Sequence, residues 1–230
     1  MPLERMRQRR APLHLVIFDC DGVLVDSEPI ANRVTAEAVT AAGWAMTPAE
    51  SDAQFLGLSF TDMQPIIERR IGRALSAEWK QALMRRMVEE LGREATAIPG
   101  AIEALHAITA LGLPWRVASN SSHEEMAVKF ARLGITDLVA GRLHSHRDVP
   151  RGKPAPDLFL AAAAAQGIAP EHCLVVEDSV PGATAAAAAG MACLGYAAHH
   201  DGERLRAVGA VPFRSMFDLP ALLAAAKATS

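Results

Sequence analysis

The chain has 230 residues, of which 50% are hydrophobic and 21% are charged, and this composition excludes a disordered polypeptide. Its 23 basic and 26 acidic side chains leave a net charge of −3, which is not the basic balance that would indicate a nucleic-acid-binding protein. No apolar stretch reaches the roughly 20 residues of a membrane span, and the apolar run after the arginine-rich residues 1–10 is too short for a signal peptide. We therefore expect a globular, cytoplasmic protein that contacts neither nucleic acid nor membrane.

Apolar runs that end in polar residues recur along the chain, and helical stretches follow them. The clearest runs lie at 13–19, 115–120 and 173–178, and weaker ones lie at 137–143 and 191–196. Continuous apolar runs are typical of strands buried on both faces. Alanine-rich stretches that end at Gly167 and Gly190 predict helices after two of them. This alternation predicts an α/β fold with a Rossmann-like, doubly wound parallel sheet.

Residues 27–95 interrupt the alternation, because they show helical patterns without a convincing strand. The stretch 96–100 then returns the chain to the alternation. We therefore predict a Rossmann-like core formed by residues 1–26 and 96–230, and an α-helical cap formed by residues 27–95. An insert after the first strand lies over the carboxyl edge of the sheet, where open α/β sheets bind ligands. The cap is expected to act as a lid that sets specificity.

Two acidic residues, Asp19 and Asp21, follow the first predicted strand. If the chain stays extended there, both carboxylates point the same way. Two like charges at the end of a buried strand need compensation, and a hard divalent cation such as Mg²⁺ supplies it through oxygen ligands. Gly22 allows a sharp turn directly after them. The alternative is that the two acids cap the following helix.

Polar side chains that suit an anion follow the next predicted strand and a later loop. Ser119 and Asn120 lie at a strand-to-helix turn, where hydroxyl, amide and free backbone N–H groups form an anion site. Lys153 lies between Gly152 and Pro154 and offers a point charge for a phosphate or a carboxylate. Each has a simpler interpretation, because Ser and Asn also cap helices and loop lysines are usually exposed.

A second acidic pair, Glu177 and Asp178, ends the strand predicted at 173–178. These carboxylates either complete an oxygen-only metal site with Asp19 and Asp21 or cap the next helix. Parallel strands carry their carboxyl ends to the same edge of a sheet. The acids, the hydroxyls and the lysine are therefore expected to meet in one crevice.

These motifs resemble those of the haloacid dehalogenase superfamily of phosphoryl-transfer enzymes, in the branch whose helical cap is inserted after the first motif. The resemblance covers nearly the whole chain and rests on FDCDGVLVDSE at 18–28, RGKPAPDLF at 151–159 and VVEDSVPG at 175–182, with ASNSS at 118–122 in the matching order. That branch includes beta-phosphoglucomutases, phosphoglycolate phosphatases and 6-phosphogluconate phosphatases. The resemblance implies the same core and cap, and it favours a monomer.

The resemblance also implies catalytic roles. Asp19 would be an ionised nucleophile that forms an aspartyl-phosphate. Asp21 would be the general acid and then the general base, with a pKa above its ordinary value. Ser119, Asn120 and Lys153 would bind the transferring phosphoryl group.

A metal site and substrate contacts follow from the same resemblance. Mg²⁺ would be held by the Asp19 carboxylate, the Asp21 backbone carbonyl and Asp178, with Glu177 as a further ligand or a neighbour of one. Additional candidate substrate contacts are Gly57, Ser59 and His123.

The second acid, Asp21, favours phosphoryl transfer over dehalogenation, since displacing a halide needs no proton. Beta-phosphoglucomutases typically place a His where this chain has Ala31, and an Arg after Gly-x-Ser, where this chain continues with Phe60. Both differences favour a phosphatase that acts on a small phosphorylated metabolite, such as a sugar phosphate or a phosphosugar acid. A phosphomutase is the alternative, and a non-catalytic binding protein on the same fold is a second one.

Overall fold

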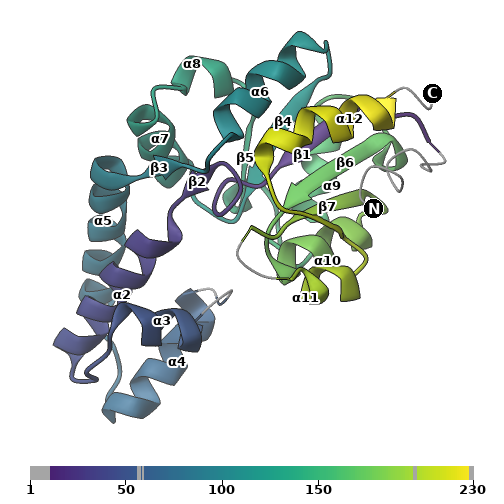
Figure 1. Cartoon of the computed structure of the whole chain (residues 1–230). Helices are drawn as coiled ribbons and strands as arrows, with labels where there is room; N and C mark the ends of the chain where they lie inside the picture. The colour runs from purple at the N-terminus through teal and green to yellow at the C-terminus, as the bar shows by residue number, and fades with distance from the viewer. Residues whose placement is uncertain (1–10, 56–57, 59, 199–200, 228–230) are drawn as a thin grey trace.

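The computed structural model describes residues 11–55, 58, 60–198 and 201–227. At its centre lies a six-stranded sheet with the order β5-β4-β1-β6-β7-β8, in which every neighbouring pair is parallel (Figure 1). The strands are β1 (Leu15–Phe18), β4 (Trp115–Ser119), β5 (Leu143–Ser145), β6 (Cys173–Glu177), β7 (Ala192–Tyr196) and β8 (Val211–Phe213). The predicted α/β fold with a doubly wound parallel sheet is confirmed.

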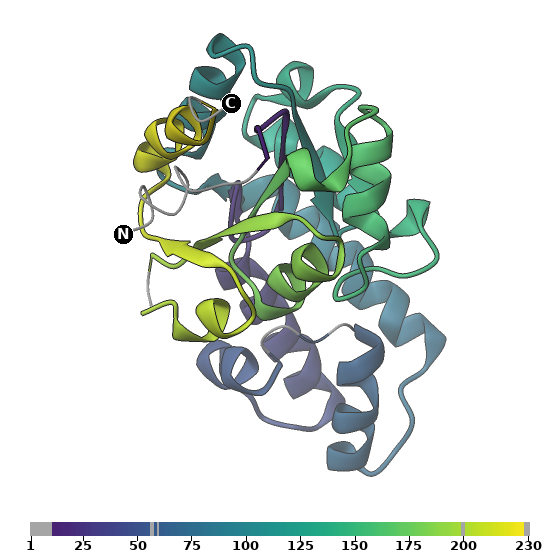
Figure 2. The same ribbon diagram turned by 90° about the vertical axis from the view of Figure 1, so that its right-hand side faces the viewer.

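Helices cover both faces of the sheet, because alternate residues of a buried strand point to opposite sides. In β1, Val16 and Phe18 belong to one apolar cluster, whereas Leu15 and Ile17 belong to another. The helices of the first cluster are α6 (Ala101–Ala110), α7 (His123–Arg132), α8 (Thr136–Val139) and α12 (Leu219–Lys227), and those of the second are α9 (Asp157–Ala164), α10 (Val180–Ala188) and α11 (Glu203–Ala207). Both groups are visible around the strands in Figure 2.

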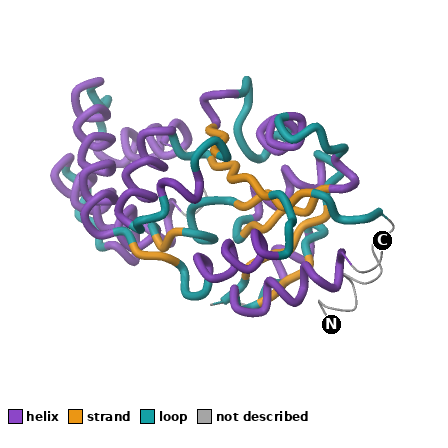
Figure 3. The backbone as a smooth tube through the Cα atoms, turned by 90° about the horizontal axis from the view of Figure 1, so that it is seen from above, coloured by secondary structure: helices purple, strands orange, loops and turns teal. Residues whose placement is uncertain are grey.

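Four further helices gather at one end of the molecule, away from the sheet (Figure 3). They are α2 (Glu28–Ala42), α3 (Pro48–Phe55), α4 (Phe60–Ile71) and α5 (Ala77–Glu94). They have an apolar centre of their own, to which Val39, Phe55 and Ile67 contribute. Buried residues of α2 and α5, among them Val34 and Leu83, also join the core that lies against the sheet. The helical group is therefore packed onto the rest of the protein and is continuous with it.

The chain leaves and re-enters the sheet-containing part through a small antiparallel ladder. It consists of β2 (Val25–Asp26) and β3 (Thr96–Ala97), and it pairs Val25 with Ala97. These two short strands lie where the helical group meets the sheet-containing part in Figure 1. We propose that this ladder is the junction between the core (1–26 and 96–230) and the helical cap (27–95).

The weak strand predicted at 137–143 is wrong in most of its length. Residues 136–139 form the single helical turn α8, and the strand β5 begins only at Leu143. The run is split for two reasons. Val139 is buried while it belongs to the helical turn, and Gly141 then adopts a φ of +71°, a left-handed conformation that ends the turn. In the part of the chain that the structure describes, no helix combines the length and apolarity needed to cross a membrane.

Candidate active site

Asp19 lies at the carboxyl edge of the sheet, directly after β1 and between β4 and β6. Its backbone N–H donates to the carbonyl of Val176 at 2.9 Å, so the β1–β6 ladder continues for one residue beyond the strand. The chain then turns sharply, because the backbone N–H groups of Leu24 and Val25 both donate to the carbonyl of Cys20 at 2.9 Å. This turn places the two acids of the first motif on the edge of the sheet.

Gly22 allows this turn to approach the end of β6. Its φ is +70°, which L side chains rarely adopt, and a Cβ at this position would collide with the carboxyl group of Asp178. The first motif and the acidic pair at the end of β6 can therefore approach this closely only because residue 22 has no side chain.

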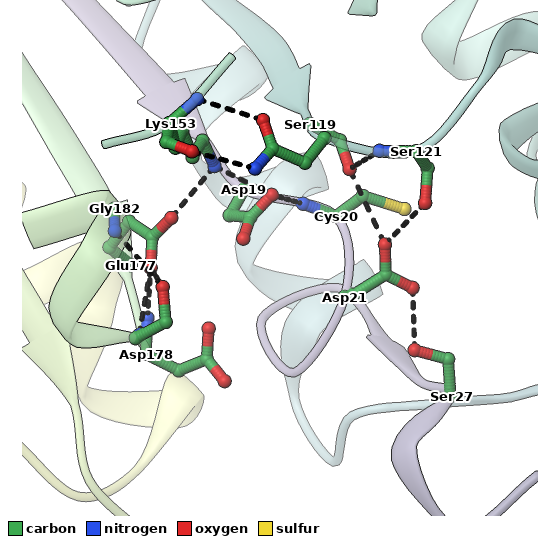
Figure 4. A network of polar contacts seen from close by, with 12 residues as sticks. Asp19, Cys20, Asp21, Ser27, Ser119, Ser121, Lys153, Glu177, Asp178 and Gly182 are labelled. Carbon is green, nitrogen blue, oxygen red and sulfur yellow. Dashed lines mark hydrogen bonds and ion pairs between the residues drawn. The ribbon is translucent and has the colours of Figure 1, made fainter. Parts of the chain in front are cut away.

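Lys153 lies between two of the predicted acids. Its Nζ is 2.8 Å from Oδ1 of Asp19 and 2.7 Å from Oε1 of Glu177, and its side chain is only 3% exposed (Figure 4). The loop that carries Lys153 is held by Asn120, whose Oδ1 accepts from the Lys153 N–H at 2.9 Å and whose Nδ2 donates to the Lys153 carbonyl at 3.2 Å. The amide predicted to bind substrate is thus engaged with the main chain of Lys153.

Glu177 is fully buried, and both of its carboxylate oxygens have partners. Oε1 accepts from Lys153, while Oε2 accepts from the backbone N–H groups of Asp178 and Ser179 and from the Ser179 hydroxyl, at 2.8 to 2.9 Å. The Lys153 ammonium outweighs burial and lowers the pKa of Glu177. This arrangement fixes Glu177 as a buried counter-charge for Lys153.

Asp19, Glu177 and Asp178 form one acidic cluster, in which ligand oxygens of the three carboxylates all lie within 4.8 Å of one another. Figure 4 shows these three residues together in one part of the site. Burial, together with the charges of Glu177 and Asp19, raises the pKa of Asp178 well above its ordinary value. The three carboxyl groups offer only oxygen donors, and the single ammonium of Lys153 cannot balance the charge of all three when they are ionised. Such a set fits a hard divalent cation such as Mg²⁺.

The expectation that Asp19 is ionised at pH 7 is wrong for the metal-free protein. Burial is the main cause, and it outweighs the attraction of Lys153 and raises the pKa of Asp19 to about 8, with repulsion from Glu177 and Asp21 adding to the rise. The expectation was based on the ordinary Asp pKa of about 3.9. Ionisation of this carboxyl at neutral pH therefore needs a further positive charge beside it.

The expectation of a raised pKa for Asp21 is also wrong in this state. Burial alone would raise the pKa of Asp21, but the ammonium of Lys129 and hydrogen bonds from Lys129, Ser27 and Ser121 outweigh it and lower the pKa to about 2. Lys129 donates to both carboxylate oxygens, at 2.7 and 2.9 Å. Oγ of Ser27 lies 2.5 Å from Oδ1, and Oγ of Ser121 lies 2.7 Å from Oδ2.

Sequence reasoning missed Lys129, Ser121 and Ser27 as members of the site. One signal was available for Lys129, because it occupies a core-facing position of α7 beside the buried Met126 and Phe130. A lysine among apolar residues on a helix face needs a buried partner. The partner itself, 108 residues earlier in the chain, is not marked by any local pattern.

The remaining predicted residues occupy different positions. Ser119 is buried, and its hydroxyl lies 3.3 Å from Oδ2 of Asp21, which brings it into the same network. His123 is exposed at the start of α7, and its Nε2 lies 2.8 Å from Asp148, so the structure does not bring it into that network. Gly57 and Ser59 lie outside the described residues.

Gly182 lies against the site from α10, and its substitution is predicted to destabilise the protein. A Cβ at this position would overlap the buried Glu177 carboxylate. In Gly182→Ala we expect the free energy of unfolding to fall by about 1–3 kcal/mol, although helix propensity alone would raise it by about 1 kcal/mol. Denaturant titration measures the sign, with Ala187→Ser on the exposed face of α10 as the control. A stabilised Gly182→Ala protein would contradict the overlap.

Comparison with known proteins places this fold and site in a family. The sequence model of the haloacid dehalogenase-like hydrolases matches residues 13–190. The chain is 32% identical over 211 residues to 6-phosphogluconate phosphatase of Escherichia coli, covering 91% of this chain and 94% of that protein. It is 34% identical over 197 residues to hexitol phosphatase A of the same organism, covering 85% and 88%.

A solved structure shows the same arrangement of the chain. The crystal structure of a haloacid dehalogenase family hydrolase from Deinococcus radiodurans, with bound phosphate and sodium, superposes with a TM-score of 0.78 at 33% identity and covers 94% of this chain and 97% of that one. The chain belongs to the haloacid dehalogenase-like hydrolase family. The predictions of this family and of a phosphatase enzyme are confirmed.

Proposed function

We propose that the protein is a Mg²⁺-dependent phosphatase that hydrolyses a small phosphorylated metabolite through an aspartyl-phosphate on Asp19. The observation that carries the proposal is the contact of Lys153 with both Asp19 and Glu177 beside Asp178. It joins a carboxylate nucleophile, a fixed cation and a set of oxygen donors at one edge of the sheet. Positive charge is needed there, because a phosphate dianion would otherwise repel the Asp19 carboxylate.

Asp19 first loses its proton to solvent, which the positive charge needed beside it favours. In the first half of the reaction, an Oδ of the ionised Asp19 then attacks phosphorus, and the bond between phosphorus and the ester oxygen breaks. The leaving oxygen takes a proton from Asp21 and departs as an alcohol. Lys153 and the Ser119 hydroxyl stabilise the charge on the transferring phosphoryl group. Because Asp21 is ionised in the resting protein, it has to acquire this proton when the negatively charged substrate enters.

In the second half, a water molecule attacks the phosphorus of the aspartyl-phosphate. Asp21, now ionised, takes a proton from this water, and the bond between phosphorus and the Asp19 oxygen breaks. Inorganic phosphate leaves, Asp19 is again a carboxylate, and Asp21 carries the proton taken from the water, as both groups were at the moment of attack. Asp19, the backbone carbonyl of Asp21 and Asp178 would hold a Mg²⁺ ion, while Glu177 pairs with Lys153. When bound, the ion would neutralise charge on the phosphate.

Mg²⁺ binding is predicted to strengthen as the pH rises toward 8. The metal needs ionised Asp19, so binding below the Asp19 pKa of about 8 releases a proton. The apparent dissociation constant should fall about tenfold per pH unit for each proton released. The measurement is Mg²⁺ titration by calorimetry at pH 6, 7 and 8, in two buffers that differ in ionisation enthalpy.

Without Mg²⁺, the contribution of Asp19 to the free energy of unfolding should decrease as the pH rises toward 8. The pKa of Asp19 is raised above its unfolded value, so this group stabilises the fold below about pH 4, and the contribution is lost as the pH rises to about 8. Asp21, whose pKa is about 2, has completed its own contribution by about pH 5. The Mg²⁺-induced shift in Tm should therefore grow between pH 6 and pH 8. A shift that is independent of pH would contradict the prediction.

The substrate class we propose is a sugar phosphate or a phosphosugar acid, in keeping with the names of the two relatives from E. coli. The test is phosphate release with Mg²⁺ from p-nitrophenyl phosphate and from a panel that includes 6-phosphogluconate and hexitol phosphates. We expect turnover of at least one alkyl phosphate, and loss of turnover with EDTA. Metal binding without release of phosphate from the whole panel would favour a non-catalytic binding protein.

A phosphomutase remains the alternative reaction of the same site. Incubation with beta-glucose 1-phosphate and a bisphosphate primer separates the two. A phosphatase releases inorganic phosphate faster than it forms glucose 6-phosphate, because water reaches its aspartyl-phosphate. Faster formation of glucose 6-phosphate would replace our proposal by the mutase.

A further inference from the structure

Lys129 is a charged residue in the middle of the apolar core, and the mechanism above gives it no role. Its side chain is 1% exposed, and it extends from the face of α7 that carries Met126 and Phe130. Burying an ammonium group is costly unless a charge and hydrogen bonds compensate for it. An apolar residue would fill this position at a lower cost, so the buried charge points to a task at the end of the side chain.

The end of the Lys129 side chain contacts the second acid of the first motif and a hydroxyl that is bonded to the same acid. Nζ lies 2.7 Å from Oδ1 and 2.9 Å from Oδ2 of Asp21, and 2.8 Å from the hydroxyl of Ser121. That hydroxyl in turn donates to Oδ2 of Asp21 at 2.7 Å. Among the ion pairs of the described residues, Lys129 is the partner of Asp21. The ammonium and the Ser121 hydroxyl thus hold both oxygens of the carboxylate.

The exposure of the two partners differs in a way that separates their roles. The Asp21 side chain is 34% exposed, whereas that of Lys129 is 1% exposed. The pair therefore presents the carboxylate, and not the ammonium, to a molecule that enters the site. Lys129 itself cannot reach a substrate except through Asp21.

We propose that Lys129 is a positioning residue, which holds the Asp21 carboxyl in the place from which it exchanges a proton with the leaving oxygen and the attacking water. The inference rests on the proposed function, in which Asp21 transfers these protons. The Lys129 side chain is held by the buried face of α7 and contacts both oxygens of Asp21. These contacts restrict the rotation of the Asp21 side chain more than a single hydroxyl contact does. The alternative is that the ion pair only stabilises the packing of α7.

Leaving-group dependence distinguishes these two roles. In a two-step mechanism, kcat/KM reports events up to the formation of the aspartyl-phosphate. The nitrophenolate of p-nitrophenyl phosphate leaves without a proton, but the alkoxide of an alkyl phosphate needs one. In Lys129→Met we expect kcat/KM for the best alkyl phosphate of the panel to fall by about 100-fold, while kcat/KM for p-nitrophenyl phosphate changes by less than about threefold.

Lys129→Met alone leaves Asp21 without its counter-charge, and this variant can fold poorly for that reason. A double-mutant cycle with Asp21→Asn keeps the test valid, because the protein that carries both changes buries no unpaired charge at this pair. If Lys129 acts through Asp21, adding Lys129→Met to Asp21→Asn should lower kcat/KM for the alkyl phosphate by less than about threefold. Met126→Ala, a packing change on the same helix, is the matched control and should affect both substrates equally.

The outcomes separate the inference from the proposed function. An equal loss for both substrates in Lys129→Met, or a loss that multiplies with that of Asp21→Asn, would overturn the positioning role while the phosphatase stands. Absence of phosphate release from both substrates by the unaltered enzyme would overturn the proposed function. A selective loss for the alkyl phosphate that disappears in the Asp21→Asn background establishes the role.

Discussion

Replacement of Asp19 by asparagine is expected to abolish Mg²⁺-dependent phosphate release, with kcat/KM lower by about 10⁴-fold or more. The amide has the shape of the carboxyl group but lacks a nucleophilic, negatively charged oxygen. Two neighbouring carboxylates are engaged elsewhere, because Glu177 is bonded through both of its oxygens and Asp21 is held by Lys129. The third, Asp178, is the one we assign to the metal. The measurement is phosphate release in single-turnover and steady-state assays.

The Asp19→Asn protein should remain folded, which separates a chemical loss from a structural one. The buried Asp19 carboxyl has a pKa of about 8, so a neutral amide replaces a group that the fold already holds largely protonated at pH 7. Lys153 keeps its contact with Glu177. Thermal unfolding should therefore change little, and Asp137→Asn on the exposed surface of α8 is the matched control with full activity. Retention of more than about 1% of the activity by Asp19→Asn would exclude Asp19 as the nucleophile.

Replacement of Lys153 by methionine is expected to reduce both stability and activity. The buried carboxylate of Glu177 loses its counter-charge and Asp19 loses its contact with the ammonium, so the free energy of unfolding should fall by about 3–5 kcal/mol. Loss of the fixed cation at the phosphoryl group should lower kcat/KM by about 10²–10³-fold in the protein that remains folded. Denaturant titration and initial rates measure the two effects separately.

Arg151 offers a matched control for Lys153, because it lies two residues away on the same loop. Its side chain is 70% exposed and pairs with Asp157 at 2.9 Å. Arg151→Met should change the free energy of unfolding by at most about 1 kcal/mol and leave the activity intact. If Arg151→Met and Lys153→Met had equal effects, the special environment of Lys153 would have no functional meaning.

The position of the candidate site could be predicted from local patterns. The three apolar runs at 13–19, 115–120 and 173–178 end in polar residues, and such runs are typical of strands in a parallel sheet, whose carboxyl ends share one edge. The sheet order β4-β1-β6 brings these ends together because the strands are neighbours. Lys153 could also be predicted, because it lies between Gly152 and Pro154 on a loop beside one of these strands. Only the structure revealed that Asn120 holds this loop in place.

Some elements were missed because they carry no distinct sequence signal. The ladder of β2 and β3 has two residues in each strand, too few for a periodic pattern. The apolar run at 137–143 suited a strand or a helical turn equally well. The turn formed because Val139 reaches the core from it and the following Gly141 adopts a positive φ.

The sequence by itself determined the fold class, the family and the identity of the acids and the lysine at the edge of the sheet, because these depend on local hydrophobic runs and on short motifs. Only the tertiary structure decided how each group ionises. The pKa of Asp19 rises to about 8 and that of Asp21 falls to about 2, although both follow the same strand. The difference arises because burial and neighbouring carboxylates dominate at Asp19, whereas Lys129, 108 residues distant in the chain, lies against Asp21.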